Sequence, residues 1–171
     1  MTSRVERKIE VVSWIVTALL LIRFIPRNKI REALVAFKFK QIITWIFGLV
    51  VVELGLIKYP KRLFFKHTTK SSFTFEFFVY PAICAIFNVN YPEKRNGFAK
   101  SCYYLFFAGI ITVFEVIAVR YTRLIRYPHW KWYWSFFTLW ITFYWSRIYY
   151  RWFFRIGKNA EEMPNQCQPL S

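Results

Sequence analysis

Three glutamates that lie inside long apolar stretches are the residues best placed to do chemistry in this sequence. Glu53, Glu76 and Glu115 each lie five residues from a polar end of their own stretch. If consecutive stretches cross a membrane in alternating directions, those ends share one side, and the carboxylates share a depth of about 7.5 Å. Ionisable groups at that depth are costly and are functional hypotheses by default. Carboxylates that faced one another would favour uptake of a proton or a cation.

A structural role for the same glutamates is the competing interpretation, and the sequence favours it. Each carboxylate could accept a hydrogen bond from a tyrosine or pair with a basic residue at the end of a stretch, such as Lys58, Arg120 or Arg123. Polar contacts of this kind hold membrane helices together. The two interpretations differ in how each helix is rotated about its axis, which the sequence does not define.

Four polar residues follow the middle apolar stretch at a spacing of four: Glu76, Tyr80, Cys84 and Asn88. Residues four apart lie on nearly the same face of a helix. The simplest interpretation is a contact with a neighbouring helix through small and polar groups. The sharper alternative is a polar pathway, in which Glu76, Tyr80 and Asn88 belong to the same candidate ion, proton or polar-network site as the other glutamates.

A proline interrupts the same stretch near its middle. Pro81 has no backbone N–H, so the carbonyl of Phe77 loses the donor that a regular helix would give it. Sharp kinks in helices are usually found at such prolines. The sequence therefore predicts a helix kink at Pro81.

Three arginines form a second stripe near the end of the last apolar stretch. Arg147, Arg151 and Arg155 are spaced four apart, and basic residues at the end of a membrane helix commonly contact anionic headgroups. We interpret all three as candidate lipid-headgroup contacts.

The remaining residue types give no sign of catalysis. The three cysteines and two histidines lack the spacing of a zinc site or a disulfide framework. Patterns typical of a P-loop, a nucleophile elbow, a zinc protease or a dinucleotide site are also missing from the sequence. We therefore expect no catalytic residue, no metal, no cofactor and no enzyme activity.

The elements that must position these residues are five apolar stretches. The sequence predicts an all-α integral membrane bundle over residues 1–156 with five transmembrane helices, followed by a polar, disordered tail over 157–171. The predicted spans are about 5–25, 33–57, 71–91, 98–122 and 130–154.

The second span carries two further expectations. Lys38 and Lys40 are interpreted as marking its interfacial first turns, because lysines near a helix end reach toward the headgroups. Gly48 and Gly55 are a heptad apart, so they should share a face where a neighbouring helix approaches closely.

Composition supports a membrane protein that meets anionic lipid. The chain has 171 residues, is 56% hydrophobic and 23% aromatic, and carries a net charge of +16. Aromatic residues at this level exceed what the core of a soluble domain this small would hold. The basic residues cluster at the ends of the apolar stretches, which favours anionic headgroups over nucleic acid as partner.

Short aromatic and proline-containing motifs recur along the membrane part of the chain. They are Leu21–Pro26, Phe78–Pro81, Phe87–Pro92, Trp130–Tyr133 and Tyr149–Phe153. Through these motifs, over about residues 14–154, the chain resembles a family of small multi-pass membrane proteins of Bacillus and related spore-forming bacteria. The resemblance implies a bacterial plasma-membrane location. The family has no established activity, so it lends no catalytic residue to this chain.

Taken together, these patterns predict a structural or accessory protein of the plasma membrane that acts through a membrane-protein partner, a second copy of itself or anionic lipid. The alternative is a small transporter or channel subunit that uses the intramembrane glutamates. Five spans would place the two termini on opposite sides. The greater basic charge after the first span than before it favours a cytoplasmic C-terminus.

Overall fold

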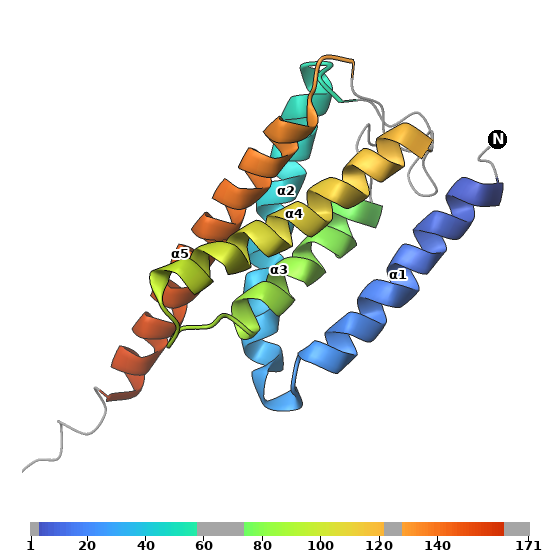
Figure 1. Cartoon of the computed structure of the whole chain (residues 1–171). Coiled ribbons are helices and arrows are strands. Elements are labelled where there is room, and N and C mark those ends of the chain that lie inside the picture. The colour runs from blue at the N-terminus through green and yellow to red at the C-terminus, as the bar shows by residue number, and fades with distance from the viewer. Residues whose placement is uncertain (1–3, 58–73, 122–127, 163–171) are drawn as a thin grey trace, which may run out of the picture.

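The computed structural model describes residues 4–57, 74–121 and 128–162, and over these ranges the chain is all-helical, without strands. It contains α1 (Arg4–Phe24), the 3-10 turn η1 (Arg27–Lys29), α2 (Ile30–Glu53), the π-helical turn η2 (Phe75–Val79), α3 (Tyr80–Val89), α4 (Gly97–Tyr121) and α5 (Trp132–Glu162). Successive helices run in opposite directions (Figure 1). The end of the bundle that contains η1 and the turn between α3 and α4 is called the lower end below.

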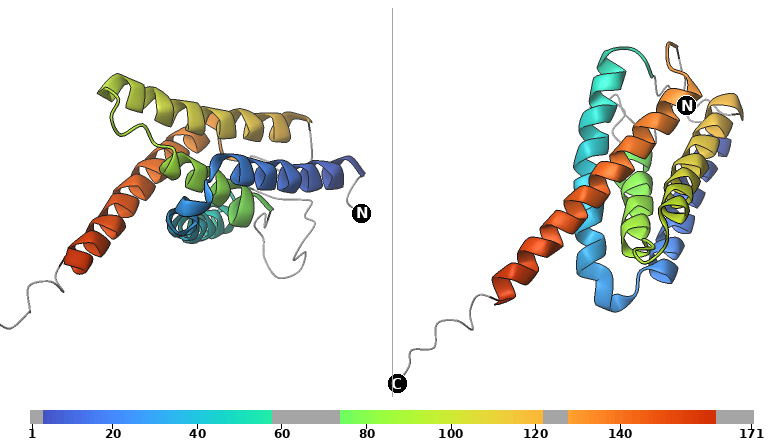
Figure 2. Two further views of the ribbon diagram at one scale, coloured as in Figure 1. Left: turned by 90° about the horizontal axis from the view of Figure 1, so that it is seen from below. Right: turned by 60° about the vertical axis from the view of Figure 1, so that its left-hand side comes forward.

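The shortest helix is the central one. Nine of the ten residues of α3 are buried, and the other helices surround it in two perpendicular views (Figures 1 and 2). Its most extensive contacts are with α2. On the side of α1, Trp14 packs on the preceding turn η2, where its ring stacks on Phe78 at 4.0 Å between centroids. On the opposite side Phe87 contacts α4 and α5, with ring centroids 5.4 Å from Phe107 and 4.8 Å from Phe143.

The chain departs from regular α-helix just before Pro81, while a kink at Pro81 stays a prediction. The five residues of η2 form a π-helical turn, at whose end the N–H of Tyr80 bonds to the carbonyl of Phe75. The carbonyl of Phe77 accepts a hydrogen bond from Nε2 of Gln41 on α2, at 3.0 Å. A side chain of the neighbouring helix therefore supplies a donor to the carbonyl that Pro81 cannot serve.

The two glycines of α2 have different roles. A Cβ at Gly48 would lie 2.5 Å from Oε2 of Glu76, so the glycine allows the close approach that the sequence predicted. Gly55 has φ +69° and open space around it, so the expected packing role is wrong for this residue. It ends α2 instead: the N–H of Leu56 bonds back to the carbonyl of Val51, which is how glycine commonly closes a helix.

Element boundaries differ from the predicted spans at both ends of the bundle. α2 ends at Glu53, a few residues before the predicted end of its span. α5 continues to Glu162, past the predicted start of the polar tail at residue 157, and its C-terminal part projects beyond the other helices (Figure 1). Residues 163–171 of the tail lie outside the described residues.

Two segments of the described chain are long and apolar enough to cross a membrane. They are Arg27–Glu53, which contains α2, and α4, while Phe75–Val89 is apolar but shorter. The all-α prediction is confirmed for the described residues. Five crossings remain a prediction, because α1 and α5 are less apolar by composition.

Candidate functional site

The interior of the bundle is rich in polar and charged side chains. Among the described residues, the buried ones are Glu10, Thr17, Lys40, Thr74, Glu76, Asn88, Thr112, Glu115, Ser135, Ser146 and Arg147. Most of those with a described contact belong to two groups. One surrounds a small cavity between α2, α3 and α5, and the other surrounds Arg147 near the lower end.

The first group lines a cavity of about 60 Å³, called the central cavity below. Its polar lining comes from Lys40 and Thr44 of α2, from Glu76 of η2 and Tyr80 of α3, and from Ser135, Thr138 and Thr142 of α5. A polar cavity of this size has room for a few water molecules.

Lys40 is the most deeply buried charged residue that is described, with no exposed surface. Its ammonium donates a hydrogen bond to Oγ1 of Thr142 and lies 4.9 Å from the centre of the Phe143 ring. The expected interfacial position of Lys40 is therefore wrong. The sequence held a signal: Lys40 shares the helical face of Ala33 and Ala36, the small residues through which α2 packs on its neighbours.

The three glutamates of the predicted site have different environments. Glu76 is 3% exposed and its carboxylate lies against the backbone of Gly48. Glu115 is buried on α4 and accepts a hydrogen bond from the hydroxyl of Tyr80 at 2.5 Å. Glu53 is exposed at the end of α2. The expected set of three buried carboxylates is therefore reduced to two, both in contact with residues that line the central cavity.

The lower half of the polar stripe on α3 contacts α5. Sγ of Cys84 lies 3.0 Å from Oγ of Ser146. Nδ2 of Asn88 donates to the same oxygen at 2.8 Å and to the carbonyl of Cys84 at 3.0 Å. At these positions the simpler interpretation, a polar contact between helices, describes what the side chains do.

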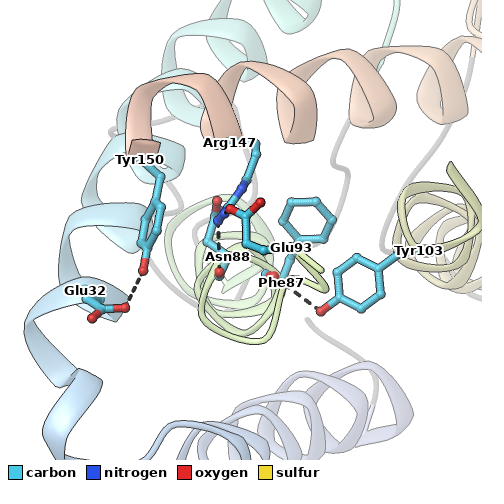
Figure 3. Close-up of polar contacts among 7 residues, drawn as sticks. All are labelled: Glu32, Phe87, Asn88, Glu93, Tyr103, Arg147 and Tyr150. Carbon is cyan, nitrogen blue, oxygen red and sulfur yellow. Dashed lines mark hydrogen bonds and ion pairs between the residues drawn. The ribbon is translucent and has the colours of Figure 1, made fainter. Parts of the chain in front are cut away.

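The second group is centred on Arg147 of α5 (Figure 3). Arg147 is 7% exposed. Its guanidinium donates to the carbonyl of Asn88 at 3.1 Å and forms an ion pair with Glu93. The same group lies 4.3 Å from the ring centre of Tyr91 and 5.0 Å from that of Tyr150. The prediction of Arg147 as a headgroup contact is corrected, because its charge is used inside the protein.

Tyr150 extends this group to α2. Its hydroxyl donates a hydrogen bond to Oε2 of Glu32, in the first turn of that helix (Figure 3). Arg147 and Tyr150 thus connect α5 to the start of α2, the end of α3 and the turn that follows α3. Sequence reasoning missed Glu32 and Glu93. The sequence could have indicated them, because they are the only acidic residues before the C-terminal tail in the basic segments that form the lower end.

The other two arginines of the stripe remain accessible. Arg151 and Arg155 are exposed. Together with Arg147 and Glu93 they line an open hollow of about 620 Å³ beside α5, called the arginine hollow below. Aromatic side chains, including Trp152 and Phe154, complete its wall.

Metal-binding chemistry has no visible basis in the described part of the chain. Over residues 4–57, 74–121 and 128–162, no three His, Cys, Asp or Glu side chains are grouped so that they could hold a metal ion. Cys84 is buried and Cys102 is exposed, and both are free thiols.

Comparison of the chain with protein-family models, with curated proteins and with solved structures gave no match.

Proposed function

We propose that this chain is an integral protein of a bacterial plasma membrane, with five membrane-crossing helices, that serves as a structural or accessory component. In this proposal it acts through a membrane-protein partner, a second copy of itself or anionic lipid. It has no catalytic role of its own.

One observation carries the membrane part of the proposal: polar groups are inside and large apolar groups are outside. Lys40 and Glu76 are buried, whereas Ile22 is 79% exposed, Val113 59% and Trp152 57%. A soluble protein rarely exposes contiguous apolar surface on this scale and almost never buries a lysine completely. In a bilayer the same distribution is favourable, because lipid surrounds the apolar residues and the helices shield the polar ones.

Helix length also supports five crossings. α1, α4 and α5 have 21, 25 and 31 residues, and a crossing needs about 20. Lys8 near the start of α1 and Trp132, Trp134 and Trp152 near the ends of the predicted last span suit the headgroup level. The central helix is shorter, but its neighbours enclose it. The resemblance to small multi-pass proteins of Bacillus and its relatives favours the same location.

The structural or accessory role is supported by the use of the buried polar groups. Lys40 binds Thr142, Tyr80 binds Glu115, and Arg147 binds Glu93. Each of these pairs joins different helices or a helix and a turn. Groups used in this way hold a bundle together.

A small transporter is the second candidate, and the central cavity is the observation that favours it. Lys40, Glu76 and Tyr80 line a space suited to water, and Glu115 is hydrogen bonded to that tyrosine. Such a set could pass protons between side chains and water molecules.

The first experiment tests whether the protein crosses the membrane five times. Reporter fusions at Met1 and Ser171 should report opposite compartments, with the C-terminus in the cytoplasm. The protein should also remain in the membrane after extraction with alkaline carbonate. Two termini in the same compartment would contradict five crossings.

The second experiment separates the two candidate functions. Purified protein in liposomes should show no proton flux above that of empty liposomes, and partners that purify with it should be retained in Glu76→Gln and Glu115→Gln. A flux that both substitutions abolish would establish the transporter instead.

A further inference from the structure

The arginine hollow is positively charged. Three arginines and one glutamate line it, which gives a net charge of +2. Arg147 lies at its buried side, where Glu93 and the carbonyl of Asn88 hold the guanidinium in place. Arg151 and Arg155 are exposed, so their charges face whatever fills the hollow. A ligand that matched this charge would carry two negative charges.

The spacing of the two exposed arginines indicates how those negative charges are arranged. Arg151 and Arg155 are four residues apart on α5, so they lie on one face and differ by about 6 Å along the helix axis. A single phosphodiester carries one negative charge and would leave one of the two positive charges unbalanced. Two phosphates joined by a short linker could engage both, each through the planar fork of one guanidinium.

The remaining wall of the hollow indicates a lipid rather than a soluble anion. Trp152 and Phe154 line it beside the arginines, and Trp152 is strongly exposed. Tryptophan prefers the level where headgroups meet acyl chains. Basic pockets beside membrane helices on the cytoplasmic side are typical sites for lipids with several phosphates.

We propose that the arginine hollow binds a lipid with two phosphates, of the cardiolipin class. One phosphate contacts Arg151 and the other contacts Arg155. Arg147 remains paired with Glu93 and adds positive potential from the buried side. This inference rests on the proposed membrane location, and it narrows the proposed lipid partner to one headgroup class and one site.

The test uses the full-length protein, purified in detergent and mixed with equal amounts of cardiolipin and phosphatidylglycerol. Native mass spectrometry then counts the lipid molecules that remain bound. The wild-type protein should retain cardiolipin in preference to phosphatidylglycerol. The double variant Arg151→Gln/Arg155→Gln should lose cardiolipin affinity by about 10- to 30-fold. All the substituted arginines are exposed, so folding, followed by circular dichroism, should not change.

A matched control removes the same charge elsewhere at the lower end of the bundle. Arg23 and Arg31 are also exposed, and Arg23→Gln/Arg31→Gln should reduce cardiolipin affinity by less than about threefold. Equal losses in both double variants would overturn the proposal, because they would reflect net charge alone. Equal retention of cardiolipin and phosphatidylglycerol by the wild-type protein would overturn it as well.

Failure of the site and failure of the membrane proposal give different results. A protein that resists carbonate extraction but shows no preference for cardiolipin retains its spans and loses the site. A protein that carbonate releases, but that still selects cardiolipin through Arg151 and Arg155, retains the site and loses the spans.

Discussion

At the scale of single residues, the notable feature is that a buried lysine, Lys40, and a buried glutamate, Glu76, line the same small cavity. Lys40 has its ammonium on Thr142, and Glu76 has its carboxylate against Gly48. Isolated charges in such a place are costly, and Lys40 and Glu76 carry opposite charges in the lining of the same cavity. The two residues should therefore depend on each other.

A double-mutant cycle tests this dependence. Lys40→Met and Glu76→Gln should each lower the free energy of unfolding by about 2–4 kcal/mol. The double variant should lose less than the sum of the two, with a coupling energy of about 1–3 kcal/mol. Thermal unfolding in detergent gives these values, and Lys38→Met, at an exposed position, is the control. Simple additivity would show that the two charges do not compensate each other.

Gly48 gives a second prediction at this scale. Gly48→Ala would place a methyl group 2.5 Å from the Glu76 carboxylate, and we expect a loss of about 1–3 kcal/mol. Gly109→Ala is the control, since a Cβ there meets nothing within 4 Å and alanine favours helix by up to about 1 kcal/mol. The double variant Gly48→Ala/Glu76→Ala, in which the Glu76 side chain is shortened to a methyl group, should remove the clash. Persistence of the full loss in that double variant, measured against Glu76→Ala, would contradict the role assigned to Gly48.

At the scale of elements, α2 donates a side-chain hydrogen bond to the segment just before α3, where the regular helical hydrogen bonding is interrupted. Pro81 leaves the carbonyl of Phe77 without its helical donor, the turn before it is π-helical, and Gln41 supplies a hydrogen bond from α2. This departure from regular α-helix thus involves two elements rather than one. A proline and a distant glutamine form one structural unit.

Substitutions in this unit should compensate each other. Gln41→Leu should cost about 1–2 kcal/mol, because it leaves a partly buried carbonyl without this donor. In a Pro81→Ala background the cost should fall to a few tenths of a kcal/mol, because alanine restores a backbone N–H to the helix. Unfolding of the four proteins in detergent completes the cycle. An equal cost of Gln41→Leu in both backgrounds would separate the two residues.

The sequence predicted these elements better than their rotations. Helix number and class follow from apolar length, and the interruption at Pro81 follows from backbone chemistry, so both could be predicted. Depth alone grouped Glu53 with Glu76 and Glu115, but depth does not determine which way a side chain faces. The structure shows this limit at Glu53, which has the expected depth but is exposed. Arg147 is buried and Arg151 is exposed, because Arg147 contacts Asn88 at the end of α3 and Glu93 and Tyr91 in the turn that follows it.

At the scale of the whole molecule, Arg147 joins parts that are far apart in the chain. It contacts the end of α3 and the following turn, and Tyr150 contacts Glu32 at the start of α2.

Arg147→Gln should therefore loosen the whole lower end, with a loss of about 3 kcal/mol in the free energy of unfolding. Glu93→Gln should cost about 1 kcal/mol or less, because Glu93 is half exposed. Thermal unfolding gives the loss, and hydrogen exchange at α3 and the start of α2 locates it. Exchange that stays confined to α5 would contradict this joining role.

The central position of α3 has a consequence for biogenesis. A ribosome completes α3 before it makes Ser146 and Arg147. If the chain inserts into a membrane as proposed, the side chains of Cys84 and Asn88 and the carbonyl of Asn88 therefore enter it before their partners on α5 exist. Polar groups in lipid without partners are costly. A chain that stopped after α4 would leave these groups without their α5 partners permanently. We therefore expect shortened chains to accumulate less than the full chain.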